Sequence, residues 1–285
     1  MSIAGLLGGC STAESTEPAL GPVVVGSGSS DISRLLAHIY AGGLRSTGVD
    51  VSVEEGMGDR SDYLAALDRG EVTMVPELTG DLLRTFDTSA SATEADEVFT
   101  ELNRSLPAGL SVGDYATAED RIAIAVASGS ESGDEIVTEF LGREERTVGI
   151  VDGELDPMDV VPVFTSKRVP TFSGASVTDV TPYADAQAAV DGVNAGKVDA
   201  LAIRTASFGP LAKDLTTLAD DDHVYSAQNV VPLYRNGVLG ENALRSFSVV
   251  AGELTTADLA DMIGEVRSGA ASGDVAGRWL GEHNL

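Results

Sequence analysis

The sequence predicts an α/β protein of two lobes that face each other across a ligand cleft. Two similar stretches, residues 65–75 and 188–201, carry this prediction. Each has the pattern of an amphipathic helix that ends at a glycine, Gly70 or Gly196, followed by an apolar run suited to a buried parallel strand. Polar residues follow both runs, and open α/β sheets bind ligands beyond the carboxyl ends of their strands. Each strand end is therefore expected to form one side of the cleft.

The elements expected in the first lobe begin with a strand at residues 21–25 that runs into a turn at Ser29 and Ser30. Serine is a helix-capping residue, so backbone N–H groups at the start of the next helix could face a ligand. The periodicity of apolar residues predicts the remaining elements of this lobe: helices over 32–46, 62–69 and 93–105, strands over 49–53 and 230–234, and a helical tail from 255 to 285.

The second lobe is predicted to be an insertion. A tight apolar strand, residues 122–127, marks the crossing into it, and the lobe contains strands at 147–151 and 160–163 and a helix over 183–194. We expect lobe 1 to comprise residues 21–120 and 225–285, and lobe 2 to comprise residues 121–224. A lobe built from both ends of the chain requires two crossing segments, which form a natural hinge.

Composition narrows the possible partners. The chain has 285 residues, enough for two lobes, and lacks the run of about 20 apolar residues that a membrane-spanning helix needs. Its 45 acidic and 18 basic residues give a net charge of −27, which argues against a nucleic-acid partner because phosphate binding requires a basic face. The acidity indicates a solvated surface in a salty or extracellular setting, with weak attraction of cationic ligands as the alternative. We expect a monomer.

The single cysteine, Cys10, excludes an internal disulfide and a cysteine metal cluster. The stretch Leu7-Gly8-Gly9-Cys10 resembles a bacterial lipobox, in which the cysteine becomes lipidated, and residues 11–18 form a polar tether. The nine preceding residues include no Lys or Arg, unlike a signal peptide, so a stray cysteine in a flexible tail is the alternative. Residues 1–20 are thus expected to be a signal remnant and tether that anchors an extracytoplasmic protein, through Cys10, to the outer face of the bacterial plasma membrane.

Catalytic signatures are poor. Gly26-Ser27-Gly28 lacks the third glycine of a dinucleotide-binding loop, and the stretch at residues 129–133 has Glu131 where a nucleophile elbow has serine. The three histidines lie far apart in the sequence, with no spacing typical of metal ligands. The sequence therefore predicts a protein that is not an enzyme, with no catalytic residue, metal site or cofactor.

A set of short segments in chain order matches a known family. The segments are Val25-Gly26-Ser27, Gly58-Asp59-Arg60, Val75-Pro76-Glu77-Leu78-Thr79-Gly80, 123–126, 196–199 and 229–233. Together they resemble substrate-binding lipoproteins of bacterial ABC importers for glycine betaine, choline and related osmoprotectants. The resemblance implies a type II periplasmic-binding-protein-like fold that captures a small polar solute by lobe closure and delivers it to a membrane permease. An extracytoplasmic sensor or interaction module with the same fold is the alternative.

The binding site departs from that family. Its members typically enclose a trimethylammonium group in aromatic rings, which attract a desolvated cation. The positions that usually supply tyrosines hold other residues here: Leu78, Arg121, Arg204 and Gln228. Because guanidinium groups bind carboxylate or phosphate, the two arginines favour a ligand with an acidic or strongly hydrogen-bonding group over a quaternary amine.

The other residues assigned to this site by the resemblance are Thr79 and the turn at Ser29 and Ser30. Two alternatives stay open. Both arginines could be paired with neighbouring carboxylates, and tyrosines nearby in the fold could rebuild the cage. The carboxylates are Glu119, Asp120 and Asp199, and the tyrosines are Tyr115, Tyr183 and Tyr225.

Overall fold

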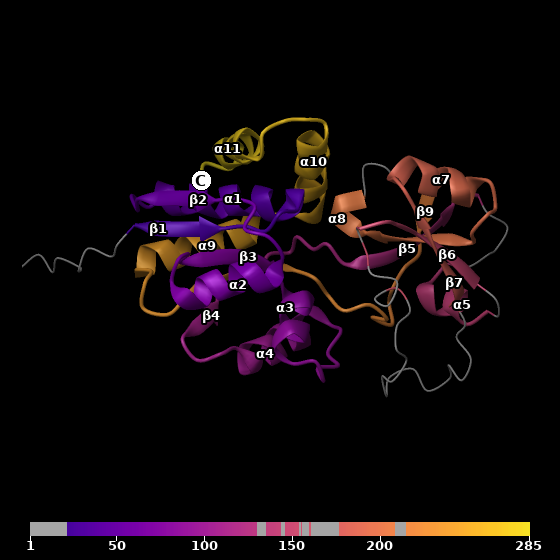
Figure 1. Ribbon diagram of the computed structural model, residues 1–285, viewed down its shortest axis with the longest axis horizontal. Coiled ribbons are helices and arrows are strands. Elements are labelled where there is room, and N and C mark those ends of the chain that lie inside the picture. Colours follow the sequence, from indigo (N-terminus) through magenta and orange to yellow (C-terminus); the bar gives the residue numbers. More distant parts are fainter. Residues whose placement is uncertain are drawn as a thin grey trace, which may run out of the picture.

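The computed structural model describes residues 22–129, 135–143, 146–153, 155, 160, 177–208 and 215–285. These residues form two lobes, each built on a five-stranded sheet and joined at a narrow waist (Figure 1). The first sheet has the order β2-β1-β3-β10-β4 and the second has the order β7-β6-β8-β5-β9. The two-lobed α/β fold expected from the sequence is therefore confirmed.

The first sheet is parallel at β2, β1 and β3 and antiparallel where β10 joins β3 and β4. Its strands are β1 (Val23–Gly26), β2 (Val51–Glu54), β3 (Met74–Leu78), β4 (Leu110–Val112) and β10 (Val230–Arg235). Alternate residues of a strand point to opposite faces. Val23 and Val25 accordingly pack into one core and Val24 packs into another, so both faces of this sheet are covered.

Helices cover both faces of the first sheet. One core contains residues of α1, α9, α10 and α11, and the other contains residues of α2, α3 and α4. The bounds are α1 (Asp31–Ser46), α2 (Arg60–Arg69), α3 (Thr79–Phe86), α4 (Ala95–Ser105), α9 (Glu241–Glu253), α10 (Thr256–Arg267) and α11 (Ser272–Glu282). Tyr40 of α1 packs edge-to-face on Phe247 of α9, with 5.6 Å between ring centroids, and this contact links the first helix to the returning chain.

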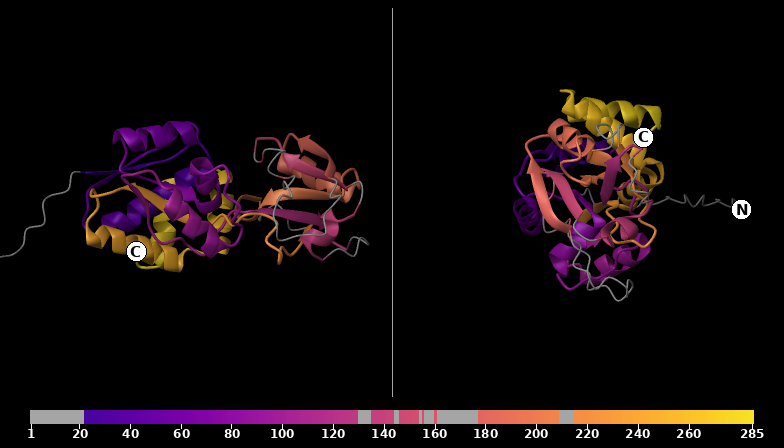
Figure 2. Two further views of the ribbon diagram at one scale, coloured as in Figure 1. Left: turned by 90° about the horizontal axis from the view of Figure 1, so that it is seen from below. Right: turned by 90° about the vertical axis from the view of Figure 1, so that its right-hand side faces the viewer.

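The second sheet is organised in the same way. Its strands are β5 (Ile122–Ala127), β6 (Arg146–Val151), β7 (Val177–Tyr183), β8 (Ala200–Arg204) and β9 (Leu215–Thr217), and its helices include α5 (Val137–Leu141) and α7 (Ala186–Asn194). Ile122, Ile124 and Val126 of β5 pack into one core, whereas Ala123 and Ala125 pack into the core beneath α7. Extended segments cross between the lobes, as Figure 2 (left) shows.

A short helix, α8 (Thr205–Phe208), directly follows β8 of the second sheet but contacts the first lobe. Ala206 is buried in the same core as α1 and α10, and the Arg267 guanidinium of α10 donates to the Ser207 carbonyl. All five strands of the second sheet fall within residues 121–224, the range predicted for the inserted lobe. Because α8 falls in that range and packs on the first lobe, the lobe boundaries remain a prediction.

Most predicted elements are present, and the repeated unit ends as expected. Gly70 is the left-handed C-cap of α2 (φ 77°), and Gly196, with φ 65°, follows Ala195, the C-cap of α7. Three differences stand out. Tyr183 ends β7, so the predicted helix 183–194 begins only at Ala186. The helices α3, α5, α8 and α9 and the strands β4, β7 and β9 were not predicted. Of the predicted strand 160–163, only Val160 lies within the described residues.

The cleft between the lobes

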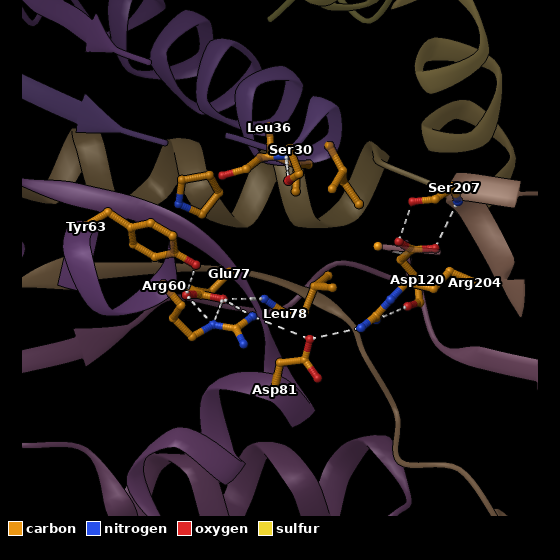
Figure 3. A pocket seen from close by; sticks show the side chains of 14 residues that line it. Ser30, Leu36, Arg60, Tyr63, Glu77, Leu78, Asp81, Asp120, Arg204 and Ser207 are labelled. Atoms are coloured by element: carbon orange, nitrogen blue, oxygen red, sulfur yellow. Dashed lines mark hydrogen bonds and ion pairs between the residues drawn. The ribbon is translucent and has the colours of Figure 1, made fainter. Parts of the chain in front are cut away.

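A cavity of about 230 Å³ lies between the two lobes (Figure 3). The first lobe contributes most of the lining, and the second lobe contributes residues from the ends of its strands and from α8. The lining residues are Ser30, Ile32, Ser33, Leu36, Arg60, Tyr63, Pro76, Glu77, Leu78, Asp81, Asp120, Gly153, Arg204 and Ser207. The carboxyl ends of β3 and β8, the two strands of the repeated unit, both reach this cavity through Leu78 and Arg204. The predicted position of the cleft thus agrees with the cavity.

The start of α1 forms one wall of the cavity. Ser30 is the N-cap, and its Oγ accepts a hydrogen bond from the Ser33 backbone N–H at 3.3 Å. This cap fixes the direction of the helix, so that Ile32 and Leu36, one turn apart, both line the cavity. Their aliphatic side chains give the wall an apolar surface next to the charged floor.

A buried ion-pair network forms the floor. Glu77 is 4% exposed although it follows the apolar run of β3. The Arg60 guanidinium binds its carboxylate through Nε at 3.1 Å from Oε1 and Nη2 at 3.2 Å from Oε2, and the Tyr63 hydroxyl donates to Oε1 at 2.7 Å. Burial, and next the Glu77 carboxylate, raise the pKa of Tyr63 above its ordinary value, so the hydroxyl remains a donor.

The start of α2 places the two partners of Glu77. Asp59 and Asp62 form a reciprocal capping box, in which the Asp59 backbone N–H donates to Asp62 Oδ2 at 3.1 Å. This box begins the helix at Arg60, and Tyr63 follows three residues later on the same helix face. The turn Gly58-Asp59-Arg60 therefore serves to bring a guanidinium and a phenol onto one buried carboxylate.

Asp81, in the first turn of α3, holds the centre of the site. Its carboxylate accepts from Arg84 Nη2 at 2.6 Å and from Gln228 Nε2 at 2.7 Å, and lies 3.4 Å from Nη2 of Arg60 and of Arg204. Burial is the largest single influence on this carboxyl and acts to raise its pKa. The three guanidinium groups together outweigh burial, so the pKa of Asp81 lies below its ordinary value and the group is ionised at neutral pH.

Arg204, the last residue of β8, reaches the first lobe across the cleft (Figure 3). Its Nη1 donates to the Asp120 carbonyl oxygen at 3.0 Å, and its Nη2 lies 3.4 Å from Asp81 Oδ2. The Asp120 carboxylate is fully engaged elsewhere. It accepts from the backbone N–H groups of Ala206 and Ser207, both at 2.9 Å, and from the Ser207 hydroxyl at 2.6 Å. Asp120 therefore fixes the start of α8, and with it the end of β8 that carries Arg204.

The predicted ligand-binding residues divide into two groups. Ser30, Leu78 and Arg204 line the cavity. The residues placed outside the described lining are Ser29, Thr79, Arg121 and Gln228. Thr79 and Gln228 are buried and bonded within the protein: Thr79 Oγ1 accepts from the Asn229 N–H at 3.0 Å, and Gln228 binds Asp81.

The two predicted arginines also differ in their partners. Arg121 Nε lies 3.2 Å from Glu119 Oε1 on the half-exposed side of the crossing strand, as the alternative interpretation expected. Arg204 pairs with Asp81 of the other lobe, and its Nη1 binds the backbone of Asp120. Asp199, another partner considered from the sequence, binds Thr147 and Arg146 at the far end of β8. Arg204 is thus the predicted arginine at the cavity.

The tyrosines considered as substitutes for a cage lie elsewhere. The Tyr115 hydroxyl donates to Asp96, the Tyr225 hydroxyl donates to the Val160 carbonyl, and Tyr183 packs in the core beneath α7. Among the lining residues that the structure describes, Tyr63 is the aromatic one, and its hydroxyl is bound to Glu77. A cage of several rings is not present in this part of the chain.

Sequence reasoning missed the charged centre of the site, which consists of Arg60, Tyr63, Glu77, Asp81, Asp120 and Ser207. One signal was available: a glutamate next to a buried apolar run requires a partner, because an ionised carboxylate is costly to bury alone. The described residues contain no cluster of three or more His, Cys, Asp or Glu side chains placed to hold an ion. Within the same residues, no helix combines the length and apolar character that a bilayer crossing requires.

Comparison with solved structures supports the fold. The chain superposes on a glycine betaine/carnitine/choline ABC transporter protein with a TM-score of 0.75 at 15% identity, covering 92% of this chain and 98% of the other. Apo YehZ from Escherichia coli gives a TM-score of 0.70 at 20% identity, with the same coverage. Lactococcal OpuAC in its closed form with glycine betaine gives 0.59 at 12% identity, covering 92% and 96%.

A family model gives the assignment. Residues 21–136 and 170–282 match the substrate-binding domain of ABC-type glycine betaine transport systems. Comparison with curated proteins gives no match. The family match spans both lobes, including β3, β8 and every residue that lines the cavity except Gly153. The chain therefore belongs to the family of substrate-binding domains of ABC-type glycine betaine transport systems.

Proposed function

We propose that this receptor binds a compact solute with one acidic group, which Arg204 holds in the cavity between the lobes. One observation carries the proposal: Arg204 comes from the second lobe, lines the cavity, and presents its Nη2 towards the first lobe. A guanidinium binds a carboxylate with two parallel hydrogen bonds, which gives both strength and orientation. A solute carboxylate at Arg204 would join the two lobes.

The aliphatic wall suits the rest of the solute. Ile32 and Leu36 of α1 face the same cavity as Pro76 and Leu78 of β3. The volume of about 230 Å³ limits the solute to a small metabolite. A quaternary ammonium group would receive little cation–π stabilisation here, because Tyr63 is the aromatic lining residue among those described. The acidic group, and not an onium group, is thus proposed as the main determinant of binding.

The mechanism is lobe closure. The family consists of non-enzymatic, extracytoplasmic transport components that bind a small solute and deliver it to the permease of an ABC importer. Closure about the crossing segments would bury the solute and bring Arg204 and the α1 wall together on it. Asp120 links Arg204 to α8: its carbonyl oxygen accepts from the Arg204 guanidinium, and its carboxylate accepts from backbone N–H groups at the start of α8.

Thermal unfolding of the protein against a solute panel tests this proposal. The panel contains glycine betaine, choline, carnitine, proline betaine, and acidic metabolites without an onium group, such as gluconate. A solute present at 100 times its Kd adds about 2.7 kcal/mol to the free energy of unfolding. We expect stabilisation by solutes with a carboxylate and none by choline. Stabilisation by choline equal to that by glycine betaine would overturn the proposal.

Two further parts of the proposal concern the anchor and the assembly state. We propose lipidation at Cys10, which lies outside the described residues, and a monomeric receptor tethered by residues 11–18. In cells of a bacterial host that expresses the full chain, the native protein should partition into detergent and a Cys10→Ser variant should remain in the aqueous phase. Equal partitioning would contradict lipidation. Light scattering of the aqueous variant should give the mass of one chain, and a multiple of that mass would contradict the monomer.

A further inference from the structure

We infer that Asp81 determines the specificity of this site: in the unliganded receptor its carboxylate occupies Arg204, and the acidic group of the solute must take its place. The inference rests on the proposed function and adds to it an internal competitor. Two observations carry the inference: the two carboxylate oxygens of Asp81 have different partners, and these partners come from both lobes.

The two oxygens of Asp81 have different roles (Figure 3). Oδ1 is held by short hydrogen bonds from Arg84 Nη2 at 2.6 Å and Gln228 Nε2 at 2.7 Å. Oδ2 points to the cavity, where the Nη2 atoms of Arg60 and Arg204 both lie at 3.4 Å. Contacts at 3.4 Å are long for charge-assisted hydrogen bonds, which are usually about 2.7–2.9 Å. Oδ1 therefore anchors the side chain, whereas Oδ2 makes only long contacts with the two guanidinium groups.

Gln228 anchors Asp81 within the first lobe. Gln228 is 3% exposed and binds Asp81 twice, since its Oε1 also accepts from the Asp81 backbone N–H at 2.9 Å. Both residues belong to the first lobe, whereas Arg204 ends a strand of the second sheet. The Asp81–Arg204 contact therefore joins the first lobe to the end of a strand of the second sheet.

Arg204 is the guanidinium group near Asp81 that a solute carboxylate could bind in place of Asp81. Three guanidinium groups, those of Arg60, Arg84 and Arg204, surround the two carboxylates of Glu77 and Asp81. Asp120 also lines the cavity, but the donors of α8 engage its carboxylate. A solute carboxylate can thus replace Asp81 as the partner of Arg204, whose Nη2 lies 3.4 Å from Asp81 Oδ2, when Arg204 turns to the solute. A solute without an acidic group leaves the Asp81–Arg204 contact intact.

The test measures the Kd values of glycine betaine, gluconate and choline by calorimetry for the wild-type protein and Asp81→Asn. Removal of the competing charge should strengthen binding of the two carboxylate probes about tenfold, the effect of one charged hydrogen bond. Choline affinity should change less than twofold. Asp81→Ser, which removes the carboxylate with a different geometry, should act in the same direction. Equal or weaker carboxylate binding by both variants would overturn the inference.

Two controls separate this inference from the proposed function. Asp31→Asn removes an acidic group that lies between the lining residues Ser30 and Ile32 in the sequence but does not itself line the cavity, and whose described partners are Arg34 and Arg267; it should leave all Kd values within twofold. Arg204→Gln should weaken carboxylate binding and abolish the gain from Asp81→Asn in the double variant. If Arg204→Gln has no effect, the proposed function fails. If it weakens binding but Asp81→Asn brings no gain, only the inference about Asp81 fails.

A measurement without solute tests whether Asp81 binds Arg204 across the lobes, even if no probe binds. If the Asp81–Arg204 contact joins the lobes in the unliganded receptor, small-angle scattering of Asp81→Asn should give a larger radius of gyration than that of the wild-type protein. Arg204→Gln should give the same increase, and Asp31→Asn should give none. Identical radii for all four proteins would overturn the inference.

Discussion

Replacement of Arg60 by methionine leaves the Glu77 carboxylate buried without its guanidinium partner. The Glu77 side chain is 2% exposed and that of Arg60 is 33% exposed, so the glutamate bears most of the desolvation cost. Removal of one partner of a buried pair typically costs about 3–5 kcal/mol. Because Arg60 is partly solvated and the Tyr63 hydroxyl still donates to Glu77, we expect the lower end, about 3 kcal/mol.

Urea unfolding followed by circular dichroism measures this loss of unfolding free energy. In a separate thermal scan, the melting temperature should fall by about 6–10 °C. The matched control is Arg69→Met. Arg69 binds Glu71 with two shorter contacts of 2.7 Å, but both side chains are more than half exposed. Exposed pairs contribute little, so this variant should unfold with the wild-type protein. If Arg60→Met and Arg69→Met lower the free energy of unfolding equally, burial does not explain how much the Arg60–Glu77 pair stabilises the protein.

The double variant Arg60→Met/Glu77→Gln tests the cause of the loss. If the penalty comes from the unpaired Glu77 charge, neutralising Glu77 should recover a large part of the stability lost in Arg60→Met. If the double variant loses the sum of the two single effects, the pair is not energetically coupled.

Three other predictions follow from the described geometry. Because folding lowers the pKa of Asp81, its carboxylate stabilises the folded state above the unfolded pKa of about 4, and this stabilisation is lost as pH falls through the folded pKa. In urea unfolding, the free energy of unfolding should therefore fall more steeply with acid for the wild-type protein than for Asp81→Asn, and parallel curves would contradict this. Gly80→Ala should destabilise by about 2 kcal/mol in urea, since its Cβ would lie 2.5 Å from the Ala227 carbonyl oxygen; unchanged stability would mean that the backbone shifts freely. The single tryptophan, Trp279, is buried in the first lobe and stacks on His283, so its emission should report unfolding and not respond to solutes; an emission change on binding would contradict a site confined to the cleft.

The fold could be predicted where local signals agree with the packing. The glycines at the ends of the repeated unit and the apolar runs after them correspond to α2–β3 and α7–β8, because capping and burial are read from adjacent residues. Helix α3 was missed because Thr79-Gly80 has the composition of a turn. In the fold, Gly80 lies in the first turn of that helix, where its missing side chain leaves space for the Ala227 carbonyl oxygen and the side chains of Ser226 and Gln228. That requirement comes from residues far away in the sequence.

The sequence predicted where the candidate site lies better than it predicted which residues line it. The strand ends located the cavity, and Arg204 lies in it, whereas Arg121 pairs with Glu119. Arg121 precedes β5 and Arg204 ends β8, and because Ile122 lies opposite Arg204 in the antiparallel β5–β8 pair, both arginines lie at the same edge of the second sheet. The sequence does not show which of the two turns to the cavity. The partners of Asp81 are Arg60, Arg84, Arg204 and Gln228. Three of these four lie more than 20 residues away along the chain, so no local pattern contains the network.

Titration calorimetry of a carboxylate solute against Arg204→Gln and Arg121→Gln tests the central claim most directly. The solute is the member of the panel that most stabilises the wild-type protein. We expect Arg204→Gln to weaken binding at least about tenfold, the loss of a charge-assisted hydrogen bond, and Arg121→Gln to leave it unchanged. If Arg121→Gln weakens binding and Arg204→Gln does not, the acidic group is not held by the arginine that joins the lobes, and this account of recognition is wrong.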